Sequence, residues 1–327
     1  MQWVRAQSIA EALSHAGPHS RYVGGGLSLS LLAQRGIEQP ETLIDLSALP
    51  LRQVEGRQGG LRIGAQVRLA ELATQPMVQS LAPLLLEIAG QIATPALRNQ
   101  ATVGGELLEP TRCPLFRDPS NARCNKRSAG SGCAVIDGVG GPGALFGTSA
   151  SCVATSASEL AVGLCAMSAE VTLYSPEGTT ERSLPLLDLY REPGSDPSSS
   201  LTIQRTELLT SVTVPVLAQQ VFGYARLAES PLAPLASAAV MLSVRDPVVV
   251  DAKVILGGLT SRPWRAKRCE QRIIGQPLAA VQSDQVVAAA LEGAQPRPSS
   301  RPLLSLAEQV VRHALRRAVE AHVAHRR

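Results

Sequence analysis

Aromatic side chains are scarce in this chain, making up only 3% of its 327 residues. Proteins that bind single-stranded nucleic acid stack the bases on such side chains, and a formal net charge of +4 is mild. The composition therefore argues against nucleic acid as a partner. No stretch approaches the ~20 apolar residues that cross a bilayer. The N-terminus also lacks the apolar core of a secretory signal, so we expect no membrane span and no export signal of the chain's own.

Histidine and cysteine are also few. The histidines lie near the two ends of the chain, away from every glycine-rich loop and every cysteine, which argues against a histidine metal site or a histidine general base: His15, His19, His313, His322 and His325. Six cysteines are too few for a disulfide scaffold in a chain of this length. Cys165 lies among helical apolar residues and is expected to be a small buried hydrophobe. No role is predicted for Cys269.

The pattern of apolar residues predicts an α+β protein with a change of character near residue 218. Before that point, strands and helices alternate over 1–50, a hairpin turns at Gly59-Gly60, residues 69–90 are helical, and a second hairpin turns at residues 176–178. After it, two strands are followed by helices over 263–274, 279–293 and 302–325. We therefore predict domains over 1–218, with lobes of about 1–54 and 55–218, and over 219–327.

Two glycine-rich loops form the first candidate site. Gly24-Gly25-Gly26 separates a predicted strand from a helix, which suits a pyrophosphate because glycine allows close approach and the helix N-terminus offers N–H groups. The second loop, Ala101 to Glu106, adds the Thr102 hydroxyl and two bare backbone positions. A tight turn without a ligand and a bulge at a strand end are the respective alternatives. Neither loop has the Rossmann pattern, but the two together favour a dinucleotide.

Four of the six cysteines fall within forty residues of each other, inside an irregular segment of about 111–152: Cys113, Cys124, Cys133 and Cys152. Their spacing matches neither the close pairs of zinc sites nor a ferredoxin. A [4Fe–4S] cluster on four thiolates is negatively charged, and nearby basic residues would offset that charge: Arg112, Arg117, Arg123, Lys126 and Arg127. Five glycines would let backbone amides approach the sulfides: Gly130, Gly132, Gly138, Gly140 and Gly141. The alternative is a flexible, reduced loop with incidental cysteines.

These motifs, in this order, resemble a known family. LRNQATVGGELL, TRCPLFRD, GTSASCVATSASELA and LGGLTSRPWR are similar to the FAD-binding medium subunit of molybdenum hydroxylases, the xanthine dehydrogenase family. Within it the chain most resembles aldehyde oxidoreductase subunits that carry FAD and a [4Fe–4S] cluster. The likeness runs from about residue 20 to 270. It implies a vanillyl-alcohol-oxidase (PCMH)-type FAD-binding domain of two lobes. A C-terminal α+β domain of the CO dehydrogenase flavoprotein type would follow.

The resemblance also implies residue roles. Gly24, Gly25, Gly26, Leu27, Ser28 and Leu29 would meet the FAD pyrophosphate, and the second loop would contribute Ala101, Thr102, Gly104, Gly105, Glu106 and Thr111. Glu159 would be an acidic FAD contact, Leu209 a backbone contact to the flavin, and Arg226 a basic residue near it. The four cysteines would hold the cluster, and no residue is assigned as a catalytic acid or base.

The chain departs from the family pattern at three places. Leu27-Ser28 replaces a Thr-Asn or Thr-Asp pair, Glu106 replaces an asparagine, and Ser156-Ala157 replaces the His-Pro of an A-T-H-P-S-D motif. Each lost polar contact costs ~1–3 kcal/mol in a buried site. FAD binding is still expected, because most contacts to the pyrophosphate are made by backbone amides.

By this resemblance the chain transfers electrons and does not itself oxidise the substrate. A large molybdenum-cofactor subunit would oxidise an aldehyde or N-heterocycle. A small subunit with two [2Fe–2S] centres would pass the electrons to FAD and then to an external acceptor. The alternatives are a structural subunit that keeps the cluster but has lost FAD, and a free-standing flavoprotein oxidase. Either co-export of the complex to the periplasm with a partner or a cytoplasmic location is compatible with the sequence.

Overall fold

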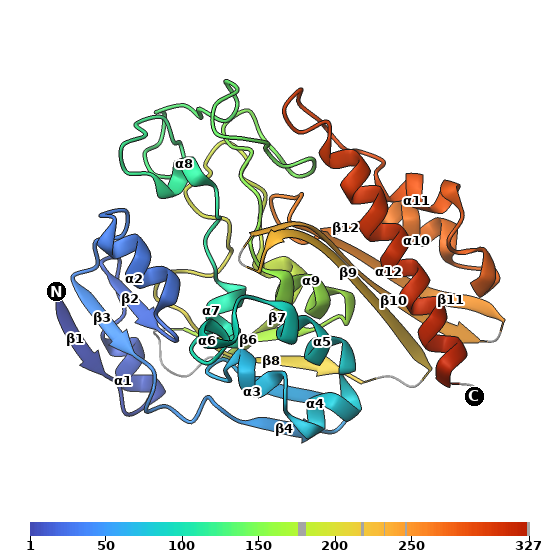
Figure 1. Cartoon of the computed structure of the whole chain (residues 1–327). Coiled ribbons are helices and arrows are strands. Elements are labelled where there is room, and N and C mark those ends of the chain that lie inside the picture. Colours follow the sequence, from blue (N-terminus) through green and yellow to red (C-terminus); the bar gives the residue numbers. More distant parts are fainter. Residues whose placement is uncertain (176–180, 217–218, 232, 246, 326–327) are drawn as a thin grey trace.

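The computed structural model describes residues 1–175, 181–216, 219–231, 233–245 and 247–325, whose strands form three separate sheets (Figure 1). The first is parallel, in the order β1-β3-β2. The crossover helices that parallel pairing requires are α1 and α2, and Ser8 caps α1 by accepting a hydrogen bond from the Glu11 N–H at 3.1 Å. The alternation predicted for residues 1–50 is confirmed: β1 (Gln2–Arg5), α1 (Ile9–Ser14), β2 (Ser20–Val23), α2 (Leu27–Gln34) and β3 (Thr42–Asp45).

The second sheet is antiparallel and has the order β4-β5-β8-β6-β7. Its central strand β8 is buried along most of its length, as its run of apolar residues predicts. The two predicted hairpins are the pairs β4–β5 and β6–β7, although the predicted turn at 176–178 lies outside the described residues. The strands are β4 (Val54–Arg57), β5 (Gly60–Gly64), β6 (Glu170–Tyr174), β7 (Glu181–Pro185) and β8 (Leu208–Pro215).

Short helices share one apolar core with this sheet, in which Leu85, Ile88 and Leu160 are fully buried. The single helical stretch predicted over 69–90 is wrong in detail. Pro76 and Pro83 each begin a new helix there, because proline lacks the N–H that a continuing helix needs. The helices are α3 (Leu69–Leu72), α4 (Pro76–Leu81), α5 (Pro83–Gln91), α6 (Pro95–Arg98), α7 (Val103–Leu107), α9 (Glu159–Ala166) and the 3₁₀ turn η1 (Leu186–Leu189).

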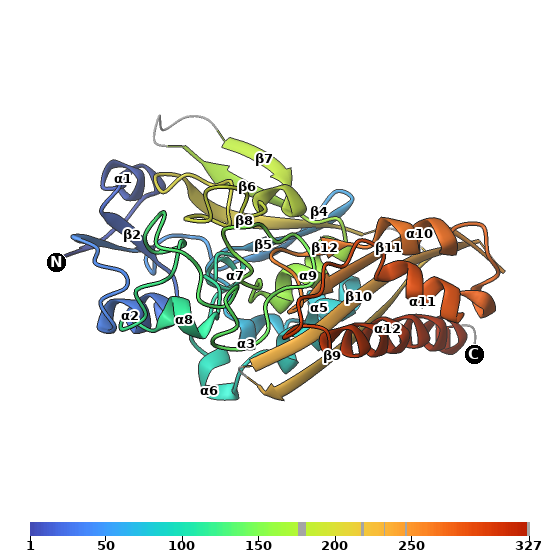
Figure 2. The ribbon, with the colours of Figure 1, turned by 90° about the horizontal axis from the view of Figure 1, so that it is seen from above.

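The third sheet, β12-β11-β10-β9, is antiparallel, and α12 lies along it (Figure 2). Gly223 of β9 permits this close approach, because a Cβ there would lie 2.0 Å from the Ala314 carbonyl oxygen. The predicted helices are present with shorter bounds, whereas β9 was not predicted. The elements are β9 (Gln220–Ser230), β10 (Ala233–Arg245), β11 (Val248–Gly257), β12 (Trp264–Arg265), α10 (Lys267–Ile273), η2 (Leu278–Ala280), α11 (Asp284–Ala290) and α12 (Leu303–His325).

The cysteine segment, residues 111–152, is irregular as predicted and forms the green loops around its short helix α8 (Pro114–Arg117) in Figure 1. It packs on the first lobe, where Leu32 of α2 forms an apolar cluster with Phe116 and Cys124. The other two cysteines lie in the cores: Cys165 is buried in α9, as predicted, and Cys269 is buried in α10. Among the helices of the described ranges, none has the length and apolar character needed to cross a membrane.

Candidate cofactor sites

The first glycine loop presents a row of backbone N–H groups. It joins β2 to α2, and Gly26 begins the helix with a φ of +73°, a left-handed conformation that glycine adopts without strain. In the described ranges, the backbone N–H groups of residues 24–29 donate no hydrogen bond, while the next N–H, that of Ser30, bonds to the Gly26 carbonyl at 2.9 Å. Free N–H groups at a helix N-terminus fit an anionic pyrophosphate.

The second loop, with the neighbouring Gln100, packs directly against Gly24 and Gly25 of the first loop. A Cβ on Gly25 would lie 2.0 Å from the Gln100 carbonyl oxygen, and a Cβ on Gly24 would lie 2.7 Å from Oγ1 of Thr102. The two loops are therefore in direct contact, as the sequence hypothesis requires. Thr102 also accepts a hydrogen bond from the Gly105 N–H at 3.2 Å and so caps α7.

Most backbone N–H groups of the second loop are already hydrogen-bonded. The Gly104 N–H donates to the Ala65 carbonyl at 2.8 Å, and that of Ala101 donates to the Leu97 carbonyl at 2.8 Å. Thr111 is buried and donates from its hydroxyl to the Thr155 carbonyl at 2.8 Å. Direct FAD contacts by Ala101, Gly104, Gly105 and Thr111 stay predictions, whereas the structural role of this loop is to position Gly24 and Gly25.

Glu106 is turned into the protein. It lies in α7 and is only 7% exposed. Burial raises the pKa of its carboxyl group to about 8, the neighbouring Glu109 adds to the rise, and Arg112 opposes it. The Glu159 backbone N–H, at the start of α9, also opposes the rise in this pKa. Both the inward orientation and the raised pKa of Glu106 would reduce its repulsion of a phosphate bound nearby.

Replacing Glu106 by glutamine should change the pH dependence of stability. Between an ordinary carboxyl pKa of 4.5 and about 8, the unfolded chain releases the Glu106 proton while the folded chain keeps it. The free energy of unfolding of the wild type therefore falls with rising pH across this window, by at most roughly 1.4 kcal/mol per pH unit relative to Glu106→Gln. Urea unfolding of both proteins at several pH values in this window measures the difference, and a constant difference would contradict a raised pKa.

Glu159 and Arg226 form a buried ion pair. Glu159 is the first residue of α9, and its carboxylate accepts hydrogen bonds from Nε and Nη2 of Arg226 at 2.7 and 3.0 Å. Tyr224 donates to the same carboxylate at 2.8 Å. Because α7 packs against α9 and β8, the structure brings Glu159 and the buried Leu209 of β8 close to the second loop. Their contacts with FAD, and that of Arg226, stay predictions.

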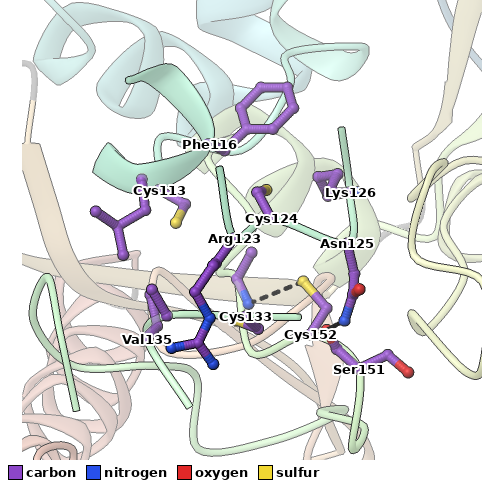
Figure 3. Close-up of a pocket in the computed structure, with 13 residues that line it drawn as sticks. Cys113, Phe116, Arg123, Cys124, Asn125, Lys126, Cys133, Val135, Ser151 and Cys152 are labelled. Carbon is purple, nitrogen blue, oxygen red and sulfur yellow. Dashed lines mark hydrogen bonds between the residues drawn. The ribbon is translucent and has the colours of Figure 1, made fainter. Parts of the chain in front are cut away.

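The four cysteines of the segment line one cavity (Figure 3). Cys113 immediately precedes α8, and Cys152 lies at the other end of the segment. Between them, Cys124 and Cys133 are joined by an isolated antiparallel β-bridge of the backbone. Burial raises the pKa of both the Cys113 and the Cys152 thiol. The N–H groups of Phe116 and Leu115 oppose this rise at Cys113, and the Ala154 N–H opposes it at Cys152. The Ala154 N–H donates to the Cys152 sulfur at 3.5 Å. Residues 39 positions apart in the chain thus meet at one point.

The donor set fits an iron–sulfur cluster better than a single ion. No carboxylate or imidazole lines the cavity, and cysteine thiolates are the usual ligands of such clusters. Within the described residues, no group of three or more His, Cys, Asp or Glu side chains is arranged to hold one metal ion. The four thiols are therefore compatible with such a cluster, and its presence stays a prediction.

The basic residues of the segment hold it together. Lys126 lines the cavity, and its ammonium group donates to the Pro197 carbonyl and the Ser200 hydroxyl, both at 2.8 Å. Arg123 pairs with Asp137, and Arg127 donates to the Asn121 carbonyl. All five glycines that we expected near the sulfides have positive φ, and they form the turns of the segment: Gly130, Gly132, Gly138, Gly140 and Gly141.

One residue of this region was missed by the sequence hypothesis. Glu109 lies between the two sites and accepts hydrogen bonds from Ser28 at 2.5 Å and from Arg117 at 3.0 Å. Ser28, which we expected at the pyrophosphate, therefore directs its hydroxyl to Glu109. The only signal in the sequence was an acidic residue between a glycine loop and a cluster of arginines.

Comparisons with known proteins agree with this architecture. Residues 1–217 match the family model of the FAD binding domain in molybdopterin dehydrogenase, and residues 228–320 match the CO dehydrogenase flavoprotein C-terminal domain. The chain is 36% identical over 274 residues to the aldehyde oxidoreductase FAD-binding subunit PaoB of Escherichia coli, covering 82% of this chain and 84% of that protein. It is 26% identical over 280 residues to the glyceraldehyde dehydrogenase medium chain of Sulfolobus acidocaldarius, covering 84% and 82%.

A solved structure shows the same fold. Reconstituted CO dehydrogenase from Oligotropha carboxidovorans superimposes with a TM-score of 0.75 at 21% identity, and 98% of each chain is covered. The predicted fold class, an α+β FAD-binding domain followed by a C-terminal domain of the CO dehydrogenase flavoprotein type, is confirmed.

Proposed function

Because this chain belongs to the family of FAD-binding flavoprotein subunits of molybdenum-containing oxidoreductases, we propose that it is the electron-transfer subunit of an aldehyde-oxidising complex, holding FAD and a [4Fe–4S] cluster. The 36% identity to an aldehyde oxidoreductase subunit supports the substrate class. The observation that carries the cluster is the cavity lined by Cys113, Cys124, Cys133 and Cys152. The segment that forms this cavity begins immediately after the second glycine loop and α7.

The residues of the chain bind and insulate the cofactors. The N–H groups at the start of α2 would hold the pyrophosphate of FAD, and the four thiolates would hold the cluster. Phe116 and Val135 are buried apolar residues that line the cavity, and they would shield a bound cluster from water. FAD, when bound, supplies the redox chemistry, and the protein positions it. No side chain is assigned as a general acid or base, since the substrate would be oxidised on another subunit.

The proposed partners follow from the family. A large subunit with a molybdenum cofactor would oxidise the aldehyde, and a small subunit with two [2Fe–2S] centres would deliver the electrons to FAD. An external acceptor would remove them. We propose that the folded complex acts either in the periplasm, after co-export with a partner, or in the cytoplasm.

The content of iron and flavin tests this proposal directly. The purified complex should be coloured and, after the contributions of the partner subunits are subtracted, should contain four iron atoms and one FAD for each copy of this chain. Metal analysis and the fluorescence of flavin released by denaturation measure both. A complex whose iron is fully accounted for by the partner subunits would contradict the cluster, and a colourless chain would contradict the function.

A second candidate is a structural subunit that keeps the cluster without FAD. The observation that favours it is the buried carboxyl group of Glu106 in the second loop, where the family pattern has an asparagine. The same flavin measurement separates the two candidates, since about one FAD per chain excludes this one.

A further inference from the structure

Glu109 joins the first glycine loop to the cysteine segment. Its carboxylate is 9% exposed, and one oxygen is bonded to the first loop while the other is bonded to the cysteine segment. One accepts a hydrogen bond from the Ser28 hydroxyl, in the first turn of α2, at 2.5 Å. The other accepts from Nη2 of Arg117, in α8, at 3.0 Å, with Nε of Arg112 at 3.8 Å. The two positive charges compensate the buried carboxylate.

Arg117 is the second half of this connection. Its side chain is 13% exposed, and Nε donates to the Thr111 carbonyl at 3.0 Å while Nη2 also reaches the Pro110 carbonyl at 3.2 Å. From the other side, Arg35 at the end of α2 donates to the Arg117 carbonyl at 3.0 Å. Both ends of α2 are therefore bonded to this one residue, directly or through Glu109.

The connection ends at the cysteines. Arg117 is the last residue of α8, and Cys113 lies immediately before that helix. Phe116, next to Arg117, packs with Leu32 of α2 and with Cys124. Glu109 and Arg117 therefore connect the first turn of α2 to the part of the segment that carries Cys113 and Cys124.

Resting on the function proposed above, we propose that Glu109 and Arg117 are positioning residues that couple occupancy of the first glycine loop by FAD to retention of the cluster by the cysteines. A bound pyrophosphate fixes the first turn of α2, which fixes Ser28 and, through Glu109 and Arg117, the cysteines of α8. By thermodynamic linkage, the cluster must then strengthen FAD binding by the same factor by which FAD strengthens the cluster.

The test compares FAD binding by the full chain with and without its cluster, using equilibrium dialysis. In the wild type, Kd for FAD should be about tenfold lower when the cluster is present, the range typical of coupled sites. In Arg117→Ala the two Kd values should agree within about twofold. The ratio of the two Kd values is the informative quantity, because damage to the fold alone would weaken FAD binding in both forms and leave the ratio unchanged.

Two further variants guard against misfolding and loss of specificity. Ser28→Ala removes one hydroxyl group from α2 and should lower the ratio at least about threefold, even if Arg117→Ala fails to fold. Asp137→Asn removes the charge of the half-exposed Arg123–Asp137 pair, which lies in the cysteine segment and has no hydrogen bond or ion pair to α2 in the described ranges, and should leave the ratio unchanged.

The coupling would be overturned if the two Kd values for FAD were equal in the wild type. It would also be overturned if both Arg117→Ala and Ser28→Ala kept the ratio of the wild type. Equal Kd values for FAD with and without the cluster in Asp137→Asn would also overturn the coupling through Glu109 and Arg117. The coupling would then depend on the whole cysteine segment. A chain with neither iron nor flavin would overturn the proposed function and the coupling together. A chain that binds both cofactors, but whose Kd for FAD is the same with and without the cluster, would overturn the coupling alone.

Discussion

Replacing Gly25 with alanine is expected to weaken FAD binding at least about tenfold. The new Cβ would lie 2.0 Å from the Gln100 carbonyl oxygen and 2.9 Å from its carbon, and both are backbone atoms that cannot move by changing a rotamer. The two loops must separate, which displaces the row of N–H groups at the start of α2. Overpacking of this kind costs about 1–3 kcal/mol, and we expect Kd for FAD to rise at least about tenfold. Equilibrium dialysis with the full chain measures it.

Gly17 provides the matched control for this prediction. It lies in the same lobe, in the turn before β2, and a Cβ there would meet no atom within 4 Å. Gly17→Ala should therefore bind FAD as the wild type does. Equal FAD affinity of the two variants would show that contact between the loops is not required for the cofactor.

The sequence predicted the elements whose local pattern is complete. The strands and helices of residues 1–50 have regular apolar spacing and glycine at the turns, and the structure contains them. The helix expected over 69–90 failed where two prolines, Pro76 and Pro83, override the apolar period. Strand β9 was missed because Gly223 and Arg226 interrupt its alternation. The structure accounts for both residues, Gly223 by contact with α12 and Arg226 by its ion pair.

The candidate sites were predictable in composition but not in connection. Glycine loops and clustered cysteines are recognisable because their chemistry restricts the residue type. The bond between Ser28 and Glu109 joins residues 81 positions apart, and the pair of Glu159 and Arg226 joins residues 67 apart. Ionic and hydrogen-bonded partners of this kind depend on tertiary packing, and many residue types satisfy them. Sequence spacing therefore carries no signal for them.

Replacing Glu159 with alanine is expected to cause the largest loss of stability. Its carboxylate is 5% exposed and takes two hydrogen bonds from Arg226, whose side chain is 14% exposed. Without the Glu159 carboxylate, the Arg226 guanidinium keeps one hydrogen-bond acceptor in the described ranges, the Gln91 carbonyl at 3.2 Å. Its buried positive charge is then no longer compensated. Removing one partner of such a pair costs roughly 3–5 kcal/mol. Tyr224 loses the acceptor of its hydroxyl group as well.

Urea unfolding of Glu159→Ala, Arg226→Ala and the double variant measures the effect. The double variant should be less destabilised than the sum of the single variants, because the second substitution removes the charge that the first leaves unpaired. Arg312→Ala is the control, since its pair with Asp284 is exposed and should contribute less than about 1 kcal/mol. Since Glu159 lies in α9 and both partners lie in β9, their bonds fix the FAD-binding domain against the C-terminal sheet. Additive effects of the two substitutions would instead mean that each residue acts independently, and the ion pair would not be what holds the two parts together.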